Sequence, residues 1–383
     1  MSTPLPRSEF PVAQRYIYLN HASAGPLPVS SATELETFVR SQTEIGVRGT
    51  FPYDLRLPEY RERIAGFVGA AGTDVALLTN TSAGASTIAA GFDWREGDEV
   101  LLCDNEFPAN AIPWVALERR GVSVRLMPTA RERLTPDVLR REISGRTRLV
   151  TVSWVSYADG YRHDIAGLAE VAHRAGALLC VDGMQALGVF PMDVKGADVD
   201  ALYAGGAKWL LSLHGISMLY VGPRLREHLE LALPGWRSMQ DMWDFHNYHQ
   251  PFSADAMRLE SGTPNLIGAL SLVCAVDLFE RSGREAIAQH VLLLTDRLCQ
   301  GLSRLGASIS TLRGPTISSG IVTFSLPGCD SLEIGKFLES EGVAATARTT
   351  GIRMSPHGYN TTMEIDAVLE MLEKFTRLQV TVS

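Results

Sequence analysis

Short apolar runs alternate with amphipathic helical patterns through the first 220 residues of the chain. Apolar residues recur at helical spacing from about residue 30, and again over 57–68, 109–120 and 165–175. Strands that alternate with helices in this way predict a parallel sheet with helices on both faces. The predicted strands are residues 75–79, 99–103, 122–127, 149–154, 177–181, 199–203 and 216–221.

The pattern changes in the last third of the chain. Residues 1–15 look like a loose arm, and an irregular, aromatic-rich stretch spans about 231–258. A domain boundary is therefore expected near 250–260, followed by an α+β part. Its predicted elements are helices at 265–281, 285–305, 331–341 and 364–378 and a strand at 321–324.

Composition excludes several classes of protein. No apolar run approaches the length of a membrane span, so no membrane partner is expected. A net charge of −8 gives no footprint for nucleic acid. The five cysteines are odd in number and lack C-x-x-C spacing, which favours a reducing, cytoplasmic location over a disulfide framework.

One lysine stands out by its position. The apolar run 200–204 ends in two glycines, and Lys208 follows closely, where open α/β sheets bind ligands. Only four lysines occur against 31 arginines; Lys336 and Lys374 fall on amphipathic helices and Lys195 lies in a loop. A surface lysine is the simpler alternative. If the chain uses a lysine as a nucleophile or Schiff-base former, it is Lys208.

Three further features are predicted at the same edge of the sheet. Asp182 leaves a buried strand, where a carboxylate costs desolvation unless a cation answers it. Ser82–Gly84 open a helix and could bind an anion, although a plain N-cap also explains them. Phe107 offers an aromatic face. With Lys208 these features match what pyridoxal phosphate requires, whereas no G-x-G-x-x-G or P-loop motif occurs.

The order of these motifs resembles that of the class V aminotransferase family, fold-type I pyridoxal-phosphate enzymes that include cysteine desulfurases, isopenicillin epimerase-like proteins and kynureninases. The resemblance implies an α/β fold with a large domain, whose mostly parallel seven-stranded sheet is covered by helices, and a smaller α+β C-terminal domain. It also implies a homodimer with an active site shared across the interface. The resemblance is carried by residues 18–22, 79–84, 106–110, 181–186, 206–210, 260–265 and 352–357.

In that fold, residues 1–20 would be an arm that packs with the small domain, 21–255 the large cofactor-binding domain and 256–383 the small domain. The resemblance gives Lys208 two roles, holding the cofactor as an aldimine and moving the Cα proton of an amino-acid substrate. Asp182 would keep the pyridine nitrogen protonated, so that the ring stabilises a quinonoid.

The resemblance also implies the remaining contacts of the site. Arg353 would clamp the substrate carboxylate, and Asn20 and His21 would also face the substrate. Thr263 would reach the phosphate from the neighbouring subunit. The other implied cofactor contacts are Ser82, Ala83 and Gly84 on the phosphate, Phe107 on the ring, and Gln185 and Tyr157 near the phenolic oxygen.

The chain departs from the family pattern at several positions. Ala207 replaces the usual histidine before the lysine, Gly205 leaves a phosphate-binding hydroxyl in doubt, and Tyr157 replaces a frequent asparagine. The loop 348–353 holds no cysteine, and Cys329 lies too far back to be an obvious substitute. A persulfide-forming cysteine desulfurase needs a thiolate there, so we expect the chain not to be one.

The predicted reaction is transamination. A C–S or other β-lyase, or an epimerase, is the alternative on the same scaffold, because all three begin with the same loss of the Cα proton. A non-catalytic cofactor-binding protein is the alternative outside the enzymes, kept open by Gly205 and Ala207. His and Asp residues within 241–249 suggest a metal site, but an aromatic flap at the pocket mouth or dimer interface is favoured, so no metal is expected.

Overall fold

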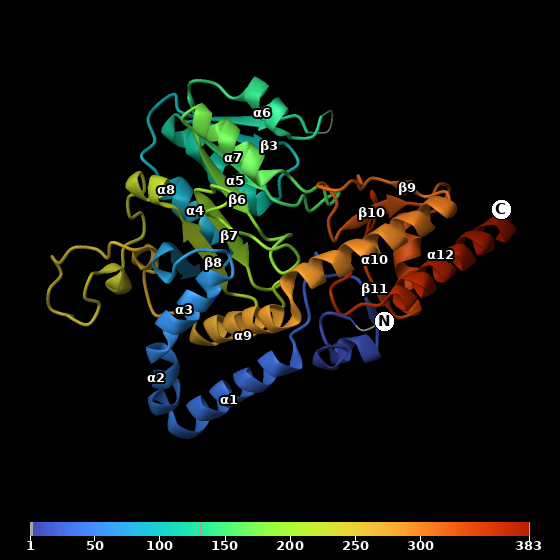
Figure 1. Ribbon diagram of the computed structural model, residues 1–383, viewed down its shortest axis with the longest axis horizontal. Coiled ribbons are helices and arrows are strands. Elements are labelled where there is room, and N and C mark those ends of the chain that lie inside the picture. Colours follow the sequence, from blue (N-terminus) through green and yellow to red (C-terminus); the bar gives the residue numbers. More distant parts are fainter. Residues whose placement is uncertain (1–2, 130–131, 383) are drawn as a thin grey trace.

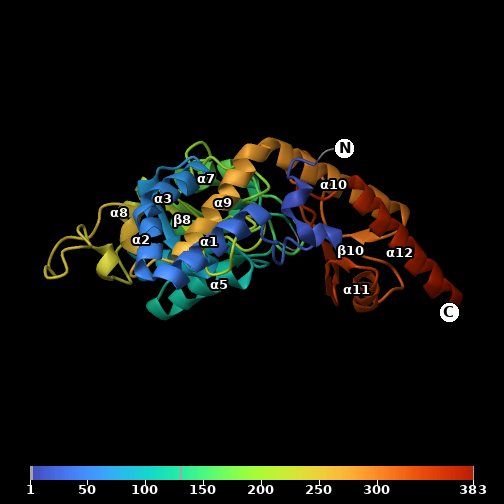
Figure 2. The same cartoon turned by 90° about the horizontal axis from the view of Figure 1, so that it is seen from below.

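The computed structural model describes residues 3–129 and 132–382, with side chains described up to residue 378. A large α/β part built on one sheet joins a smaller part that contains α10 (Arg284–Arg304) and α12 (Thr362–Val382), as Figures 1 and 2 show. Within the described residues, no helix has the length and apolar character needed to cross a membrane.

The central sheet has seven strands, and the predicted mostly parallel architecture is confirmed. β8 is antiparallel to both of its neighbours, whereas the pairs from β7 to β4 are all parallel. The order across the sheet is β2 (Val75–Leu78), β8 (Ser217–Val221), β7 (Ala201–Gly205), β6 (Leu178–Asp182), β5 (Thr147–Ser153), β3 (Glu99–Cys103) and β4 (Ser123–Met127).

Continuous apolar runs form these strands because both faces of the sheet are covered. On β6, for example, Leu179 and Val181 lie in one hydrophobic cluster and Leu178 and Cys180 in another on the opposite face. The helices of this part are α1 (Val29–Ile45), α2 (Val47–Leu55), α3 (Leu57–Gly66), α4 (Thr81–Gly91), α5 (Pro108–Val115), α6 (Pro136–Glu142), α7 (Ile165–Arg174), α8 (Pro223–Glu227) and α9 (Leu266–Ser282).

The predicted boundary at 255/256 divides residues that share one core. It assigns α9 to the small domain, yet Leu270, Val273 and Val276 of this helix are buried in the same cluster as the sheet. The smaller part has its own core between α10, α12 and an antiparallel sheet. Its other elements are β9 (Ser308–Ile309), β10 (Val322–Ser325), α11 (Ser331–Ser340), β11 (Val343–Ala344), β12 (Thr346–Arg348) and β13 (Gly351–Met354).

The described part of the N-terminal arm, from residue 3 onward, is not loose, contrary to the expectation; residues 1 and 2 lie outside the described residues. Leu5 and Phe10 are fully buried, and the ring of Phe10 stacks on that of Tyr359 with centroids 4.0 Å apart. Arg7 donates to the carbonyl of Tyr359 (2.9 Å), and β1 (Ile17–Tyr18) pairs in parallel with β11. Two widely spaced apolar residues among polar ones give no periodic signal, which is why the sequence hid these anchors.

Removing the Phe10 ring should therefore destabilise the protein. We expect Phe10→Ala to lower the free energy of unfolding by about 3–5 kcal/mol, because it opens a cavity against Tyr359. Tyr16→Ala is the matched control, since Tyr16 is half exposed. Urea unfolding of both variants measures the difference, and equal losses would contradict the anchoring role of Phe10.

Candidate active site

Lys208 follows the carboxyl end of β7 and reaches the pocket over a tightly packed turn. A Cβ at Gly206 would lie 2.9 Å from the Cβ of Ser212, so the turn admits only glycine there without a shift. The amine of Lys208 lies 5.2 Å from the centroid of the Phe107 ring. Lys208 and Phe107 line one pocket, which encloses about 200 Å³.

Asp182 ends β6, the strand next to β7, and lines the same pocket. Its Oδ1 accepts the backbone N–H of Met184 (2.8 Å), while no hydrogen bond to Oδ2 is recorded among the described residues. Burial raises the pKa of Asp182 to about 7, and the nearby charge of Glu106 acts in the same direction. The carboxylate therefore offers an acceptor to a cation that enters the pocket.

The two charges of this edge of the sheet perturb one another. Burial lowers the pKa of Lys208 to about 8, although the charge of Asp182 opposes that shift. The positive charges of Arg353 and Arg348 lower it further. An amine with this pKa exists partly as the free base near neutral pH, which suits a nucleophile or a proton acceptor.

The predicted phosphate-binding residues Ser82, Ala83 and Gly84, at the N-terminus of α4, do not all face the same cavity. Ser82 lines the Lys208 pocket, but Ala83 lines a second cavity. Gly84 lines neither, because it packs against the sheet, where an added Cβ would lie 2.8 Å from that of Tyr203. Asn80 caps the helix by accepting the N–H of Ala83 (2.9 Å) and also lines the Lys208 pocket.

Glu106 is a partly buried carboxylate that the sequence analysis did not single out. It accepts the backbone N–H (2.7 Å) and hydroxyl (2.5 Å) of Ser153, and the side-chain amide of Asn110 (3.1 Å). Burial raises its pKa. These bonds fix the residue before Phe107 and so hold the aromatic ring over the pocket. The signal lay in the motif itself, where Glu106 and Asn110 flank Phe107 at helical spacing.

Tyr157 and Gln185 both line the pocket. The ring of Tyr157 meets Phe107 edge-on, with centroids 5.1 Å apart. The side-chain amide of Gln185 donates to the carbonyl of Ala22 (3.0 Å) and accepts the indole N–H of Trp209 (2.7 Å). Gln185 is thus held in place by its neighbours. Other lining residues that the analysis did not assign are Asn80, Thr81, Ala109, Ser153 and Met184.

Arg353 is buried beside Tyr157. It donates to the carbonyl of Tyr157 (3.0 Å) and the hydroxyl of Ser23 (2.8 Å), and its Nε has no hydrogen-bond partner among the described residues. From Ser23 the hydrogen bonds continue to Thr346 (2.9 Å) and on to the side chain of Asn20 (2.7 Å). Asn20 is therefore tied to the arginine through two hydroxyls, and its predicted substrate contact stays a prediction.

His21 is placed differently from the expectation. It is fully buried and is not among the lining residues of the pocket. One ring nitrogen bonds the carbonyl of Ser355 and the other the hydroxyl of Tyr359, both at 2.9 Å. Both ring nitrogens are thus engaged in hydrogen bonds within the core. His21 therefore anchors the 20–25 loop to the smaller part and does not face a substrate in this chain.

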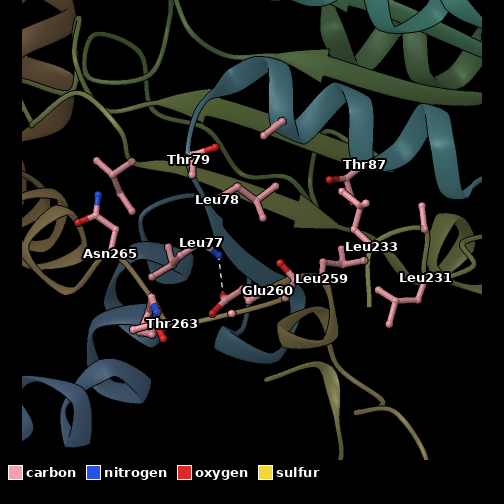
Figure 3. Close-up of a pocket in the computed structure, with 16 residues that line it drawn as sticks. Leu77, Leu78, Thr79, Thr87, Leu231, Leu233, Leu259, Glu260, Thr263 and Asn265 are labelled. Atoms are coloured by element: carbon pink, nitrogen blue, oxygen red, sulfur yellow. Dashed lines mark hydrogen bonds between the residues drawn. The ribbon is translucent and has the colours of Figure 1, made fainter. Parts of the chain in front are cut away.

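Thr263 lies apart from Lys208, in the second cavity, which encloses about 230 Å³. Figure 3 shows it near Leu77 and Glu260, whose carboxylate accepts the N–H of Leu77 (2.7 Å). A buried ion pair with Arg61 holds Glu260. Thr263 does not join the Lys208 pocket of its own chain, and its predicted role in a neighbouring subunit stays a prediction.

The aromatic flap predicted at 241–249 is part of a longer segment, residues 231–252, that projects from the large part as the yellow loop of Figure 1; we call this whole segment the aromatic flap. Trp236, Trp243 and Phe245 of this segment pack on one another, with centroids 6.0–6.2 Å apart, and none lines the Lys208 pocket. Across residues 3–129 and 132–382, no group of three or more His, Cys, Asp or Glu could hold a metal ion.

Lys208 should react as a free amine at lower pH than a surface lysine. Burial lowers its pKa to about 8, whereas the hydrogen bond that Lys336 donates to the carboxylate of Glu333 raises the pKa of Lys336. Acetylation of the protein without ligand, followed by mass spectrometry, should place the midpoint for Lys208 near pH 8 and that for Lys336 higher. Coincident midpoints would contradict the desolvated environment of Lys208.

Comparison with known proteins completes the description of the site. The family model described as aminotransferase class-V matches residues 23–368. A probable cysteine desulfurase of Methanothermobacter thermautotrophicus is 29% identical, covering 98% of each chain. An uncharacterized aminotransferase of Bacillus subtilis is 30% identical over 80% of each. A C-DES mutant with glycine covalently linked to its PLP cofactor has a TM-score of 0.89 at 23% identity, covering 96% of this chain and 98% of that one.

Proposed function

Because the chain belongs to the class V aminotransferase family, whose cofactor is pyridoxal phosphate, we propose that it cleaves the C–S bond of cysteine or a related sulfur amino acid. One relative that matches across nearly the whole chain is named a probable cysteine desulfurase. That name fits neither the predicted transamination nor the predicted exclusion of a desulfurase. C–S cleavage replaces transamination as the proposed reaction.

The residues present fit the cofactor. The free Oδ2 side of Asp182 suits a protonated pyridine nitrogen, Phe107 offers a ring face, and Ser82 stands at a helix N-terminus that suits a phosphate. When bound, the cofactor withdraws electrons from Cα of the amino acid. Lys208 then takes the Cα proton on its amine, and Arg353 holds the carboxylate by charge-assisted hydrogen bonds.

The observation that supports one set of sulfur products over the other is the lack of a thiol among the lining residues of the Lys208 pocket. Release of alanine requires transfer of the sulfur to an attacking thiolate: cysteine plus a thiolate gives alanine plus a persulfide. None of the five cysteines lines the Lys208 pocket. Cys103 and Cys180 lie in buried strands, where burial raises the pKa of both thiols, and Cys329 packs against the small core.

The proposed products are therefore pyruvate, ammonia and sulfide. In this elimination, cysteine loses the Cα proton and the C–S bond breaks with its electron pair on sulfur, and one water then hydrolyses the remaining enamine to pyruvate and ammonia. No acceptor thiol and no redox partner are needed. The five unpaired cysteines support a reducing, cytoplasmic location as part of the same proposal.

Product analysis tests the proposal. The holoenzyme incubated with L-cysteine should release pyruvate and sulfide in equal amounts, and Lys208→Ala should lower the rate about 100-fold or more, because the proton acceptor is lost. Lys336→Ala, at an exposed lysine, is the control and should leave the rate unchanged.

Two results would contradict the proposal. Alanine formed together with a persulfide on a cysteine of this chain, found by peptide mapping and lost in Cys329→Ser, would indicate a persulfide-forming desulfurase. Pyridoxamine phosphate with a keto acid would indicate transamination, the function that the name of the Bacillus relative favours.

We propose a homodimer for the same protein. Thr263 and Ala83 line a cavity away from Lys208, as expected if Thr263 serves the other subunit. Sedimentation at micromolar concentration should give twice the chain mass; a monomer that still binds the cofactor would rule out the shared site. Exposed apolar side chains on α1, α2 and the aromatic flap are available for such a contact: Val39, Ile45, Val47, Phe51, Leu55, Leu233, Trp243, Phe245 and Tyr248.

A further inference from the structure

A second guanidinium lies near the carboxylate clamp. Arg348 ends β12, which pairs with β13, the strand of Arg353. The guanidinium carbon of Arg348 lies 5.7 Å from the centroid of the Tyr157 ring. Tyr157 lines the Lys208 pocket, and its carbonyl accepts from Arg353. The ring and carbonyl of Tyr157 therefore connect the two arginines to one side of the pocket.

Neither arginine has an acidic partner within residues 3–129 and 132–382. Arg353 donates only to neutral oxygens, and its buried Nε has no hydrogen bond. Within the described part of the chain, the guanidinium of Arg348 has one side-chain contact, the face of the Tyr157 ring. Elsewhere a buried arginine is neutralised by the protein itself, as Arg61 is by Glu260. Two unpaired cations in one place make an anion-binding surface.

The charges of these arginines reach the reactive amine. Burial, together with the charge of Arg348, lowers the pKa of Arg353 to about 10. Both charges also lower the pKa of Lys208. Like charges held together repel one another, and bound anionic groups relieve that repulsion. One carboxylate occupies Arg353 alone, which leaves Arg348 for a second anionic group.

We propose that Arg348 binds an acidic group on the side chain of the substrate, so that the preferred substrate is a sulfur amino acid with a second acid. The inference rests on the proposed C–S cleavage and adds its specificity. The exposed position of Arg348 at the strand end suits the far end of a side chain, whereas buried Arg353 suits the invariant α-carboxylate.

Two substrates of equal size test the role of charge. S-carboxymethyl-L-cysteine and S-carbamoylmethyl-L-cysteine differ only in an acid against an amide, and cleavage with one water gives pyruvate, ammonia and the corresponding thiol. The holoenzyme should favour the acid by about tenfold or more in kcat/KM, the worth of one charge-assisted hydrogen bond. Arg348→Gln should abolish the preference, and Arg348→Lys should retain part of it.

The control variant is Arg174→Gln, an exposed arginine of α7 paired with Glu170, which should keep the preference. A wild-type enzyme without preference, or an Arg348→Gln variant that keeps it, would overturn the role of Arg348 while leaving C–S cleavage intact.

Calorimetry of the same two compounds separates the inference from the proposed reaction. If neither is cleaved, but the acid binds about tenfold more tightly than the amide and Arg348→Gln removes the difference, Arg348 has the proposed role and C–S cleavage is wrong. Equal binding of acid and amide by the wild type would overturn the role of Arg348 whether or not cleavage occurs.

Discussion

The site depends on one electrostatic constraint, the removal of a carboxylate and an amine from water at the ends of neighbouring strands. Asp182 is the last residue of β6 and Lys208 follows the end of the adjacent strand β7, so the sheet brings the two groups to one pocket. Burial raises the pKa of Asp182 and lowers that of Lys208, and both shifts favour the uncharged form of the group. Each charge offsets part of the desolvation of the other. A cofactor that is cationic at its ring nitrogen and electrophilic at its aldehyde answers both groups.

Three other segments of the chain support the surroundings of Asp182 and Lys208. Glu106 anchors the segment that carries Phe107 by bonding Ser153, the register partner of Asp182. In the 20–25 loop, the carbonyl of Ala22 accepts a hydrogen bond from the side chain of Gln185. The β12–β13 hairpin carries Arg353 and Arg348, whose charges lower the pKa of Lys208. Hydrogen bonds thus join the 20–25 loop to the hairpin of the smaller part, although more than 300 positions separate Asn20 from Thr346 and Arg353 from Ser23.

Sequence patterns predicted the sheet well because its strands are apolar on both faces. They failed where order comes from single anchors. Leu5 and Phe10 fix the arm without periodicity, and α6 (Pro136–Glu142) is too short to show a pattern, despite its Thr135 cap. The pocket residues Lys208 and Asp182 were found by their place after strands. The placement of His21 depends on Ser355 and Tyr359, distant partners that no local motif reveals.

Four packed rings, those of His21, Trp209, His357 and Tyr359, lie next to Lys208 in the core and affect how the activity depends on pH. His21 and His357 pack with Trp209 and Tyr359, and burial lowers the pKa of His357 to about 4 and that of His21 well below its usual range. Both imidazoles stay uncharged throughout the neutral range. The two histidines next to Lys208 therefore carry no charge at neutral pH. A bell-shaped dependence of the rate on pH would reflect groups that face the pocket and not these core residues.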